Sequence, residues 1–209
     1  LTRAELQQQG ISPVFAGNPM MDGLAPTAAR SPFPAADSQT LTVVLLPGSR
    51  APEAYANWHI ILHAVASVLR QFAPRPVRLL GAIAPALNLT NFQRALLETG
   101  WQDQASPTPC YAKDNGRLLL TQTAYADCLQ AANAAIALAG TATEQFVGLG
   151  KPAFTTPGAG PQFNATFAKL QTRLLGPSVI LVPTAETVGT AMAQVLSDRD
   201  RLDRIRQNG

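Results

Sequence analysis

Four short stretches of small residues carry the polar groups in this sequence that could bind an anion. Each combines backbone N–H groups with a predicted helix start, an arrangement that favours phosphate. Arg50 adds a planar fork of donors that suits phosphate oxygens. The alternative for Gly48-Ser49-Arg50 is a tight turn with a solvated arginine. The stretches are Pro47-Gly48-Ser49-Arg50, Gly140-Thr141-Ala142-Thr143-Glu144, Pro157-Gly158-Ala159-Gly160-Pro161-Gln162 and Pro183-Thr184.

Alternating apolar runs and amphipathic segments predict the elements that position these stretches. Strands separated by helices are typical of βαβ units. We therefore predict a doubly wound, Rossmann-like α/β fold, with a parallel sheet covered by helices on both faces. Ligands of such sheets bind outside the carboxyl ends of the strands, so all four stretches should meet at one edge. The expected strands are 41–46, 77–83, 117–121, 135–139, 153–155 and 179–182, and the expected helices are 52–72, 90–99, 125–132, 143–148, 162–175, 186–196 and 198–207.

The first forty residues are less regular than the rest. Residues 4–9 are expected to be helical, and Pro13–Ala16 is expected to form a short strand. A stretch rich in Pro, Ala and Ser follows, which is typical of a linker or long loop. The sequence starts at Leu1 without a methionine, directly before this predicted helix, which indicates a fragment.

Composition excludes several classes of protein. The net charge is +3, but only 14% of the 209 residues are charged and the basic ones are scattered, so we expect no nucleic-acid partner. Cys110 and Cys128 form no CxxC pair, so we expect neither a disulfide scaffold nor a zinc site. Two cysteines without such a pattern fit a protein of the reducing cytosol. No apolar run approaches the roughly 18 residues of a membrane span, and no signal peptide is visible.

The common nucleotide and metal motifs are incomplete. A dinucleotide fingerprint starting at Gly158 would need a third glycine at Phe163, and Gly150-Lys151 is followed by Pro152 rather than Ser or Thr. His59 and His63 are four residues apart on a predicted helix, but they lack a third ligand and fit a solvated face. The charged tail from Ser197 is likewise predicted to be a solvated helix.

Glu144 has two interpretations. Thr141-Ala142-Thr143-Glu144 matches a capping box, in which Thr141 is the N-cap and Glu144 bonds back to its N–H. The other interpretation is that the carboxylate binds a ligand at the carboxyl end of strand 135–139. The residues alone favour neither role.

Several stretches, taken in order, resemble lipid-A-disaccharide synthases. They are "GNPMMDGL", "LLPGSR" with Glu53 three residues on, and "ALAGTATEQ". The stretch "PGAGPQFNATFAKLQTRLLG" is more similar to the lipid-A-disaccharide synthase-related branch. The similarity extends from about Gly17 to Leu196.

The resemblance implies the C-terminal, donor-binding half of a two-domain GT-B glycosyltransferase. Residues 1–40 would then be the end of a preceding domain with an interdomain linker, and residues 41–209 the nucleotide-sugar-binding domain. The expected activity is metal-independent, cofactor-free transfer of a GlcNAc-type sugar from UDP to a sugar or lipid-linked sugar. The acceptor site and the catalytic base would lie in the missing half, so the isolated chain should be inactive. The family implies a cytoplasmic protein and leaves room for peripheral association with the inner face of the membrane.

The resemblance also implies roles for single residues. Arg50 would lie near the donor phosphates, Glu144 would hold ribose hydroxyls, and Gln162 and Asn164 would lie near the donor sugar and phosphates. Two other classes stay open, namely a UDP-sugar epimerase of the same fold and a non-catalytic nucleotide-sugar-binding module. The full set of expected donor-binding residues is Gly48, Ser49, Arg50, Glu53, Gly140, Thr141, Thr143, Glu144, Gly158, Gly160, Gln162 and Asn164, with no metal ligands.

Overall fold

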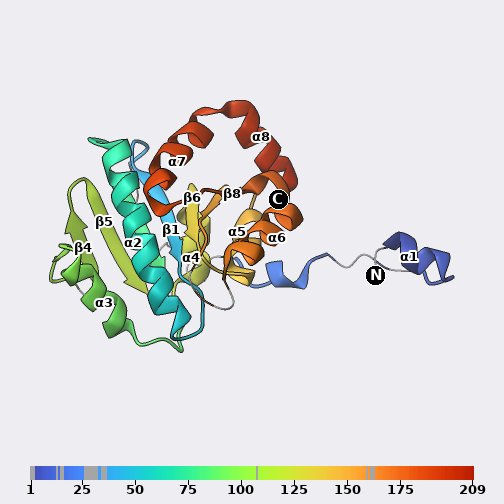
Figure 1. Cartoon of the computed structure of the whole chain (residues 1–209), viewed down its shortest axis with the longest axis horizontal. Coiled ribbons are helices and arrows are strands. Elements are labelled where there is room, and N and C mark those ends of the chain that lie inside the picture. The colour runs from blue at the N-terminus through green and yellow to red at the C-terminus, as the bar shows by residue number, and fades with distance from the viewer. Residues whose placement is uncertain are drawn as a thin grey trace.

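A mixed sheet of eight strands organises the part of the chain that the structure describes. The computed structural model describes residues 3–12, 14, 17–25, 33, 37–106, 108–158, 160 and 163–209. The strands are β1 (Leu41–Leu46), β2 (Val77–Ala82), β3 (Gln102–Asp103), β4 (Cys110–Lys113), β5 (Gly116–Thr121), β6 (Ala134–Ala137), β7 (Ala153–Thr155) and β8 (Val179–Leu181). Their order across the sheet is β3-β4-β5-β2-β1-β6-β7-β8 (Figure 1).

The strands from β5 to β8 in this order run parallel to their neighbours. Numbered along the chain, these parallel strands follow the order 3-2-1-4-5-6 of the Rossmann fold. The order reverses between β1 and β6, where Val43 pairs with Ala134 and Leu46 with Ala137. The predicted doubly wound α/β fold is confirmed.

The other two strands correct the expectation of a purely parallel sheet. β4 pairs antiparallel with β5, and β3 pairs antiparallel with β4. The turn between β4 and β5 places Asp114 at φ 50°, a left-handed conformation that Asp tolerates better than most residues. β4 has four residues and only Tyr111 among them is buried. So short an edge strand shows too little alternation to be recognised in the sequence.

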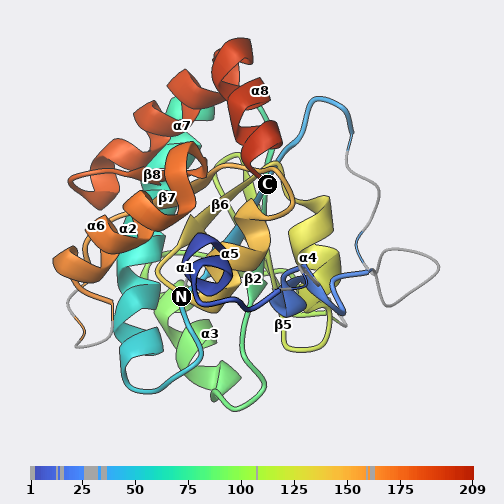
Figure 2. The same ribbon diagram turned by 90° about the vertical axis from the view of Figure 1, so that its right-hand side faces the viewer.

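Helices cover both faces of the parallel strands, because the strands are apolar on both sides. Val43 and Leu45 belong to the core cluster under α2, α3 and α7, whereas Val44 and Leu46 belong to the cluster under α4 and α5. Figure 2 shows α2 and α7 on one side of the sheet and α4 on the other. No helix in the described part of the chain is long and apolar enough to cross a membrane. The helices are α2 (Glu53–Phe72), α3 (Leu89–Glu98), α4 (Tyr125–Ala131), α5 (Thr141–Val147), α6 (Ala165–Leu175), α7 (Val188–Ser197) and α8 (Arg199–Asn208), with 3₁₀ turns η2 (Gly176–Ser178) and η3 (Ala185–Thr187).

The N-terminal residues are only partly described. Helix α1 (Arg3–Gln8) lies apart from the sheet in Figure 1. The strand predicted at Pro13–Ala16 lies outside the described residues except for Val14, which is not in a strand. The following stretch was expected to be a linker. It contains the short turn η1 (Pro19–Met21).

Part of that stretch packs on the domain. Leu24 and Phe33 are buried in the cluster under α4 and α5. The side chain of Gln130 on α4 donates a hydrogen bond to the Leu24 carbonyl at 3.2 Å. Leu24 and Phe33 thus cover apolar surface of the sheet domain.

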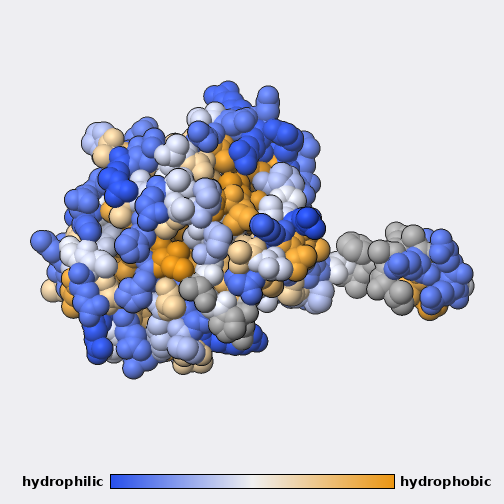
Figure 3. Space-filling model, in the orientation of Figure 1, coloured by the Kyte–Doolittle hydropathy of each residue, from blue (hydrophilic) through white to orange (hydrophobic). Residues whose placement is uncertain are grey.

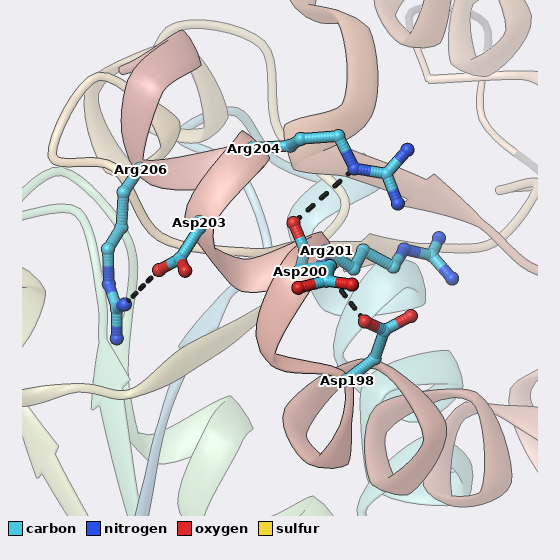
Figure 4. Close-up of polar contacts among 6 residues, drawn as sticks. All are labelled: Asp198, Asp200, Arg201, Asp203, Arg204 and Arg206. Atoms are coloured by element: carbon cyan, nitrogen blue, oxygen red, sulfur yellow. Dashed lines mark hydrogen bonds and ion pairs between the residues drawn. The ribbon is translucent and has the colours of Figure 1, made fainter.

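The last helix, α8, is charged and solvated, as predicted. Asp198 caps it by accepting a hydrogen bond from the backbone N–H of Arg201, and the exposed pair Arg206–Asp203 lies on its surface (Figure 4). Figure 3 shows a strongly hydrophilic surface over this helix. Ile205 is the fully buried residue of α8 and anchors it to the core.

Cys128 lies on α4 in the centre of the core on its face of the sheet. Its side chain is fully buried. Burial, helped by the nearby Asp127, raises the pKa of the thiol from 9.0 to about 12. Above pH 9 the unfolded chain therefore loses a proton that the folded chain retains.

We expect the raised pKa of Cys128 to make the folded chain less stable at alkaline pH. The stability that the neutral thiol contributes is complete below pH 9 and is lost as the pH rises towards about 12. For one group the free energy of unfolding falls by up to about 1.4 kcal/mol per pH unit. Urea unfolding at several pH values should show a shallower decline for Cys128→Ala than for the natural chain. Cys110→Ala, at a half-buried thiol, is the control, and equal slopes for the natural chain and Cys128→Ala would contradict the assignment.

Candidate functional site

A cavity of about 670 Å³ opens at the carboxyl edge of the sheet, where the strand order reverses. The loop after β1 and the start of α2 form one wall, and the loop after β6 with α5 forms another. Phe163, just before α6, and Phe167, in its first turn, complete this side. The whole lining comprises residues 46–50, 53, 54, 57, 82–85, 122, 125, 138–142, 145, 163 and 167.

The turn after β1 depends on Gly48. Its φ of +101° is unfavourable for residues with a side chain. The loop after β6 lies beside this turn, since a Cβ on Gly48 would be in ordinary contact, at 3.5 Å, with the Leu138 carbonyl oxygen. Ser49 and Arg50 follow on the cavity wall, with exposed side chains. Gly48-Ser49-Arg50 therefore forms a tight turn, as one interpretation predicted, and also lies on the cavity wall, as the anion-site interpretation requires.

The connection from β6 to α5 corrects the predicted capping box. The N-cap is Gly140, and no side chain caps the helix. The N–H groups of Thr143 and Glu144 both donate to the Gly140 carbonyl, at 3.0 and 3.2 Å. Thr141 is therefore the first helical residue rather than the N-cap. The capping-box interpretation of Glu144 is wrong, because the helix starts one residue earlier than that motif requires.

The predicted residues of this connection divide into two groups. Gly140 and Thr141 line the cavity. Thr143 is fully buried and its hydroxyl donates to the Ala139 carbonyl at 2.6 Å, so it does not. Glu144 is half-buried, one turn along α5 from Thr141, and is not part of the lining.

Glu53 joins the start of α2 to the connection after β7. Its Oε1 accepts a hydrogen bond from the backbone N–H of Phe163 at 2.6 Å. A Cβ on Gly160 would collide with the same carboxylate, so the backbone passes close to it. Of the charged side chains in the described part of the chain, Arg50 and Glu53 line the cavity. Glu53 thus holds a loop as well as facing the cavity.

Four other predicted residues come from this connection. Gly158 and Gly160 border the cavity without lining it. Asn164 caps α6, since its Oδ1 accepts a hydrogen bond from the Phe167 N–H at 3.0 Å. Gln162 lies outside the described residues. Pro183-Thr184 follows β8, the strand at the far edge of the sheet, and does not reach the cavity.

The opposite wall of the cavity was not predicted from the sequence. Residues 82–85 lie at the end of β2 and just beyond it, and Gln122 and Tyr125 follow β5. Gln122 is fixed by hydrogen bonds from its Nε2 to the carbonyls of Ala84, at 3.0 Å, and Leu87, at 2.9 Å. Like the other loops of the site, these residues lie at the carboxyl ends of parallel strands. They were not predicted as part of the site because the loops after these two strands contain no Gly or Arg.

Tyr125 gives this wall a neutral phenol. Its hydroxyl donates to Oε1 of Gln145 at 2.6 Å, and Nε2 of Gln145 donates to the Met20 carbonyl at 2.6 Å. Burial raises the pKa of Tyr125 to about 12. With Ala82, Ile83 and Pro85, it makes this end of the cavity less polar than the end near Arg50.

The histidines lie away from the cavity. His59 and His63 have exposed side chains on α2, as the solvated-face interpretation predicts. The described residues contain no group of three or more His, Cys, Asp or Glu side chains that could hold a metal ion.

Three solved structures share this fold at low sequence identity. A protein from Listeria monocytogenes assigned as a UDP-N-acetylglucosamine 2-epimerase matches with a TM-score of 0.54 and 12% identity, over 91% of this chain and 42% of that one. The UDP-GlcNAc 2-epimerase from Neisseria meningitidis, solved with UDP-GlcNAc bound, gives 0.52 and 11%, over 82% and 40%. The spinosyn rhamnosyltransferase SpnG gives 0.55 and 18%, over 100% and 57%.

At this level of sequence identity, the three comparisons show that the proteins share a fold and nothing more. The chain spans 40–42% of the length of the two epimerases. No protein-family model matches the sequence, and no curated protein matches it either. The chain has the Rossmann-like α/β fold of GT-B proteins, as the resemblance implied. The particular family, lipid-A-disaccharide synthase, stays a prediction.

Proposed function

We propose that this chain is the nucleotide-sugar-binding half of a GT-B enzyme and that its ligand is a UDP-sugar. The observation that carries the proposal is the cavity at the switch point of the sheet, with Gly48, Ser49 and Arg50 on one side and Gly140 and Thr141 on the other. Ligands of doubly wound sheets bind at this point. The epimerase from Neisseria meningitidis, which has a similar fold, was solved with UDP-GlcNAc bound.

The diphosphate would lie between the loops that follow β1 and β6. Arg50 supplies the positive charge on this part of the wall, and a guanidinium can bind two phosphate oxygens at once. Gly48 and Gly140 lack a Cβ, so the phosphates could approach the backbone N–H groups there. These groups would stabilise the charge that builds up on a departing UDP, without a metal ion.

The nucleoside would lie towards the wall formed by the ends of β2 and β5. Ile83 and Pro85 offer apolar surface to a flat base, and Tyr125 is neutral there. The ribose would then pass the start of α5, within reach of Glu144 in the ligand-bound state. This proposal gives Glu144 the ribose role that the resemblance implies.

The whole protein would transfer a GlcNAc-type sugar from UDP to a sugar or lipid-linked acceptor, as in lipid-A-disaccharide synthases. This chain would supply donor binding, and the part of the protein that precedes it would supply the acceptor site and the base. Such an enzyme would work in the cytoplasm, next to the membrane that holds its acceptor. The sequence resemblance from Gly17 to Leu196 supports this choice.

UDP-sugar epimerisation is the second candidate, because two of the proteins with a similar fold are UDP-GlcNAc 2-epimerases by their descriptions. The full-length protein can be incubated with UDP-GlcNAc and followed by NMR. Transfer releases UDP only when an acceptor is present, whereas epimerisation changes the sugar without one. Binding without either reaction would indicate a non-catalytic module.

The first prediction concerns the isolated chain. We expect it to bind UDP and UDP-GlcNAc in calorimetric titrations but to transfer no sugar, because the proposal assigns the donor loops to this chain and the acceptor site to the other half of the enzyme. Adenosine and guanosine diphosphates serve as control ligands. Absence of UDP binding would refute the proposed function, and sugar transfer by the chain alone would refute the division between the two halves.

The second prediction concerns Arg50. A hydrogen bond to a charged group contributes roughly 1.5–3 kcal/mol, so Arg50→Ala should weaken UDP binding about ten- to a hundredfold. Uridine, which lacks the diphosphate, should bind as before. Arg70→Ala makes the same change of charge in the last turn of α2 and is the matched control. An equal loss for UDP and uridine would place Arg50 away from the phosphates.

The third prediction concerns Glu144. No side chain caps α5, so Glu144→Gln should leave the melting temperature almost unchanged. The amide accepts weaker hydrogen bonds from ribose hydroxyls than the carboxylate does. UDP affinity should therefore fall at least about tenfold, near 1.4 kcal/mol. Glu98→Gln, in the last turn of α3, controls for the loss of charge, and an unchanged UDP affinity in Glu144→Gln would exclude the ribose role.

A further inference from the structure

Residues 18–24, which precede the sheet domain in the sequence, are hydrogen-bonded to the wall of the cavity. The Met20 carbonyl, in η1, accepts a hydrogen bond from Nε2 of Gln145 at 2.6 Å, and Oε1 of Gln145 accepts one from the Tyr125 hydroxyl at 2.6 Å. A backbone carbonyl can only accept, so it orients the amide and makes the phenol the donor. Gln145 and Tyr125 line the cavity, whereas Met20 does not. Two consecutive hydrogen bonds thus connect η1 to the wall around Tyr125.

This segment is held on the domain by contacts that lie outside the cavity. Oδ1 of Asn18 caps η1 by accepting a hydrogen bond from the Met20 N–H at 3.0 Å. Met21 packs on the end of α5, because a Cβ added to Gly148 would lie only 2.6 Å from its sulfur. Leu24 is buried in the core cluster under α4 and α5. The position of the Met20 carbonyl is therefore set by residues that do not line the cavity.

We propose that residues 18–24 position the nucleoside-binding wall through Gln145, an inference that rests on the proposed function. With the Met20 carbonyl in place, the Gln145 amide is fixed at both its nitrogen and its oxygen, and it restrains the Tyr125 hydroxyl. A wall that is ordered before the base arrives loses less entropy on binding. Displacement of η1 would remove the acceptor of Nε2 and release this wall. Gln145 is then a positioning residue, which acts on the nucleoside through Tyr125.

The coupling works in both directions, because the effect of one site on another is reciprocal in binding free energy. A nucleotide that packs on Tyr125 would hold residues 18–24 more firmly on the domain. Under the proposed function, these residues lead from the half that binds the acceptor. The hydrogen bonds of Gln145 would then transmit donor binding to the connection between the two halves.

The first test removes contacts of residues 18–24 without altering the cavity lining. Asn18→Ala and Met21→Ala change side chains that are not part of that lining. In calorimetric titrations, each should weaken uridine and UDP by the same factor, about three- to tenfold, the effect of one neutral hydrogen bond. Pyrophosphate, which would bind at the Arg50 end, should bind as before. This pattern differs from that of Arg50→Ala, which should weaken UDP but not uridine.

Two controls separate positioning from a general disturbance of the site. Asp198→Ala removes a similar side-chain cap from α8, outside the cavity lining, and should leave every affinity unchanged. Tyr125→Phe breaks the chain of hydrogen bonds at its other end, so Asn18→Ala should weaken uridine little further in that background. Unchanged uridine affinity in Asn18→Ala and Met21→Ala, an equal loss for pyrophosphate, or additive losses with Tyr125→Phe would overturn the inference.

Amide hydrogen exchange tests the reverse direction of the coupling. Saturating the natural chain with UDP should slow exchange in residues 18–24, because the segment opens less often when Tyr125 is held by a ligand. Tyr125→Phe, also saturated with UDP, should not show this slowing. Equal exchange rates with and without UDP in the natural chain would contradict the coupling. Failure of the natural chain to bind UDP at all would instead refute the proposed function itself.

Discussion

The cavity exists because the helices that follow β1 and β6 leave the sheet on opposite faces. α2 packs on the face of Val43 and Leu45, and α5 packs on the face of Val44 and Leu46. Right-handed crossovers require this divergence wherever the order of parallel strands reverses. Two neighbouring strands therefore end without a chain crossing above them. Everything that this site offers a ligand lies at or beside that gap.

Buried polar side chains hold the backbone around the gap in place. The carbonyl of Leu138 accepts from Asn57, and the carbonyl of Ala139 accepts from both Thr143 and Gln171. Gln171 also donates to the Gly140 carbonyl at 3.3 Å. Each such bond contributes roughly 1 kcal/mol net. The segment after β6 is thus ordered by side chains of α2, α5 and α6 before any ligand arrives, which would reduce the entropy lost on binding.

Much of this arrangement could be predicted from the sequence, and the exceptions have physical reasons. β1 was predicted to the residue, because an uncharged apolar run buried on both faces has few other interpretations. β4 and the wall around Tyr125 were missed because short edge strands and loops without Gly or Arg give weak local signals. The capping box at Thr141 failed for a different reason. Several adjacent residues can begin a helix, and the backbone at Gly140 decides which one does.

Asn57 is a buried polar residue whose role sequence patterns conceal. It lies at helical spacing among core residues, so periodicity assigns it to the core, and its burial agrees. Only the account of its hydrogen bonds separates it from a packing residue, since both amide hydrogens are used and the oxygen is not. A structural amide would be expected to use its oxygen as well. Its two donated bonds nevertheless tie the segments after β1 and β6 to α2, so Asn57 holds both edges of the gap that opens between these strands.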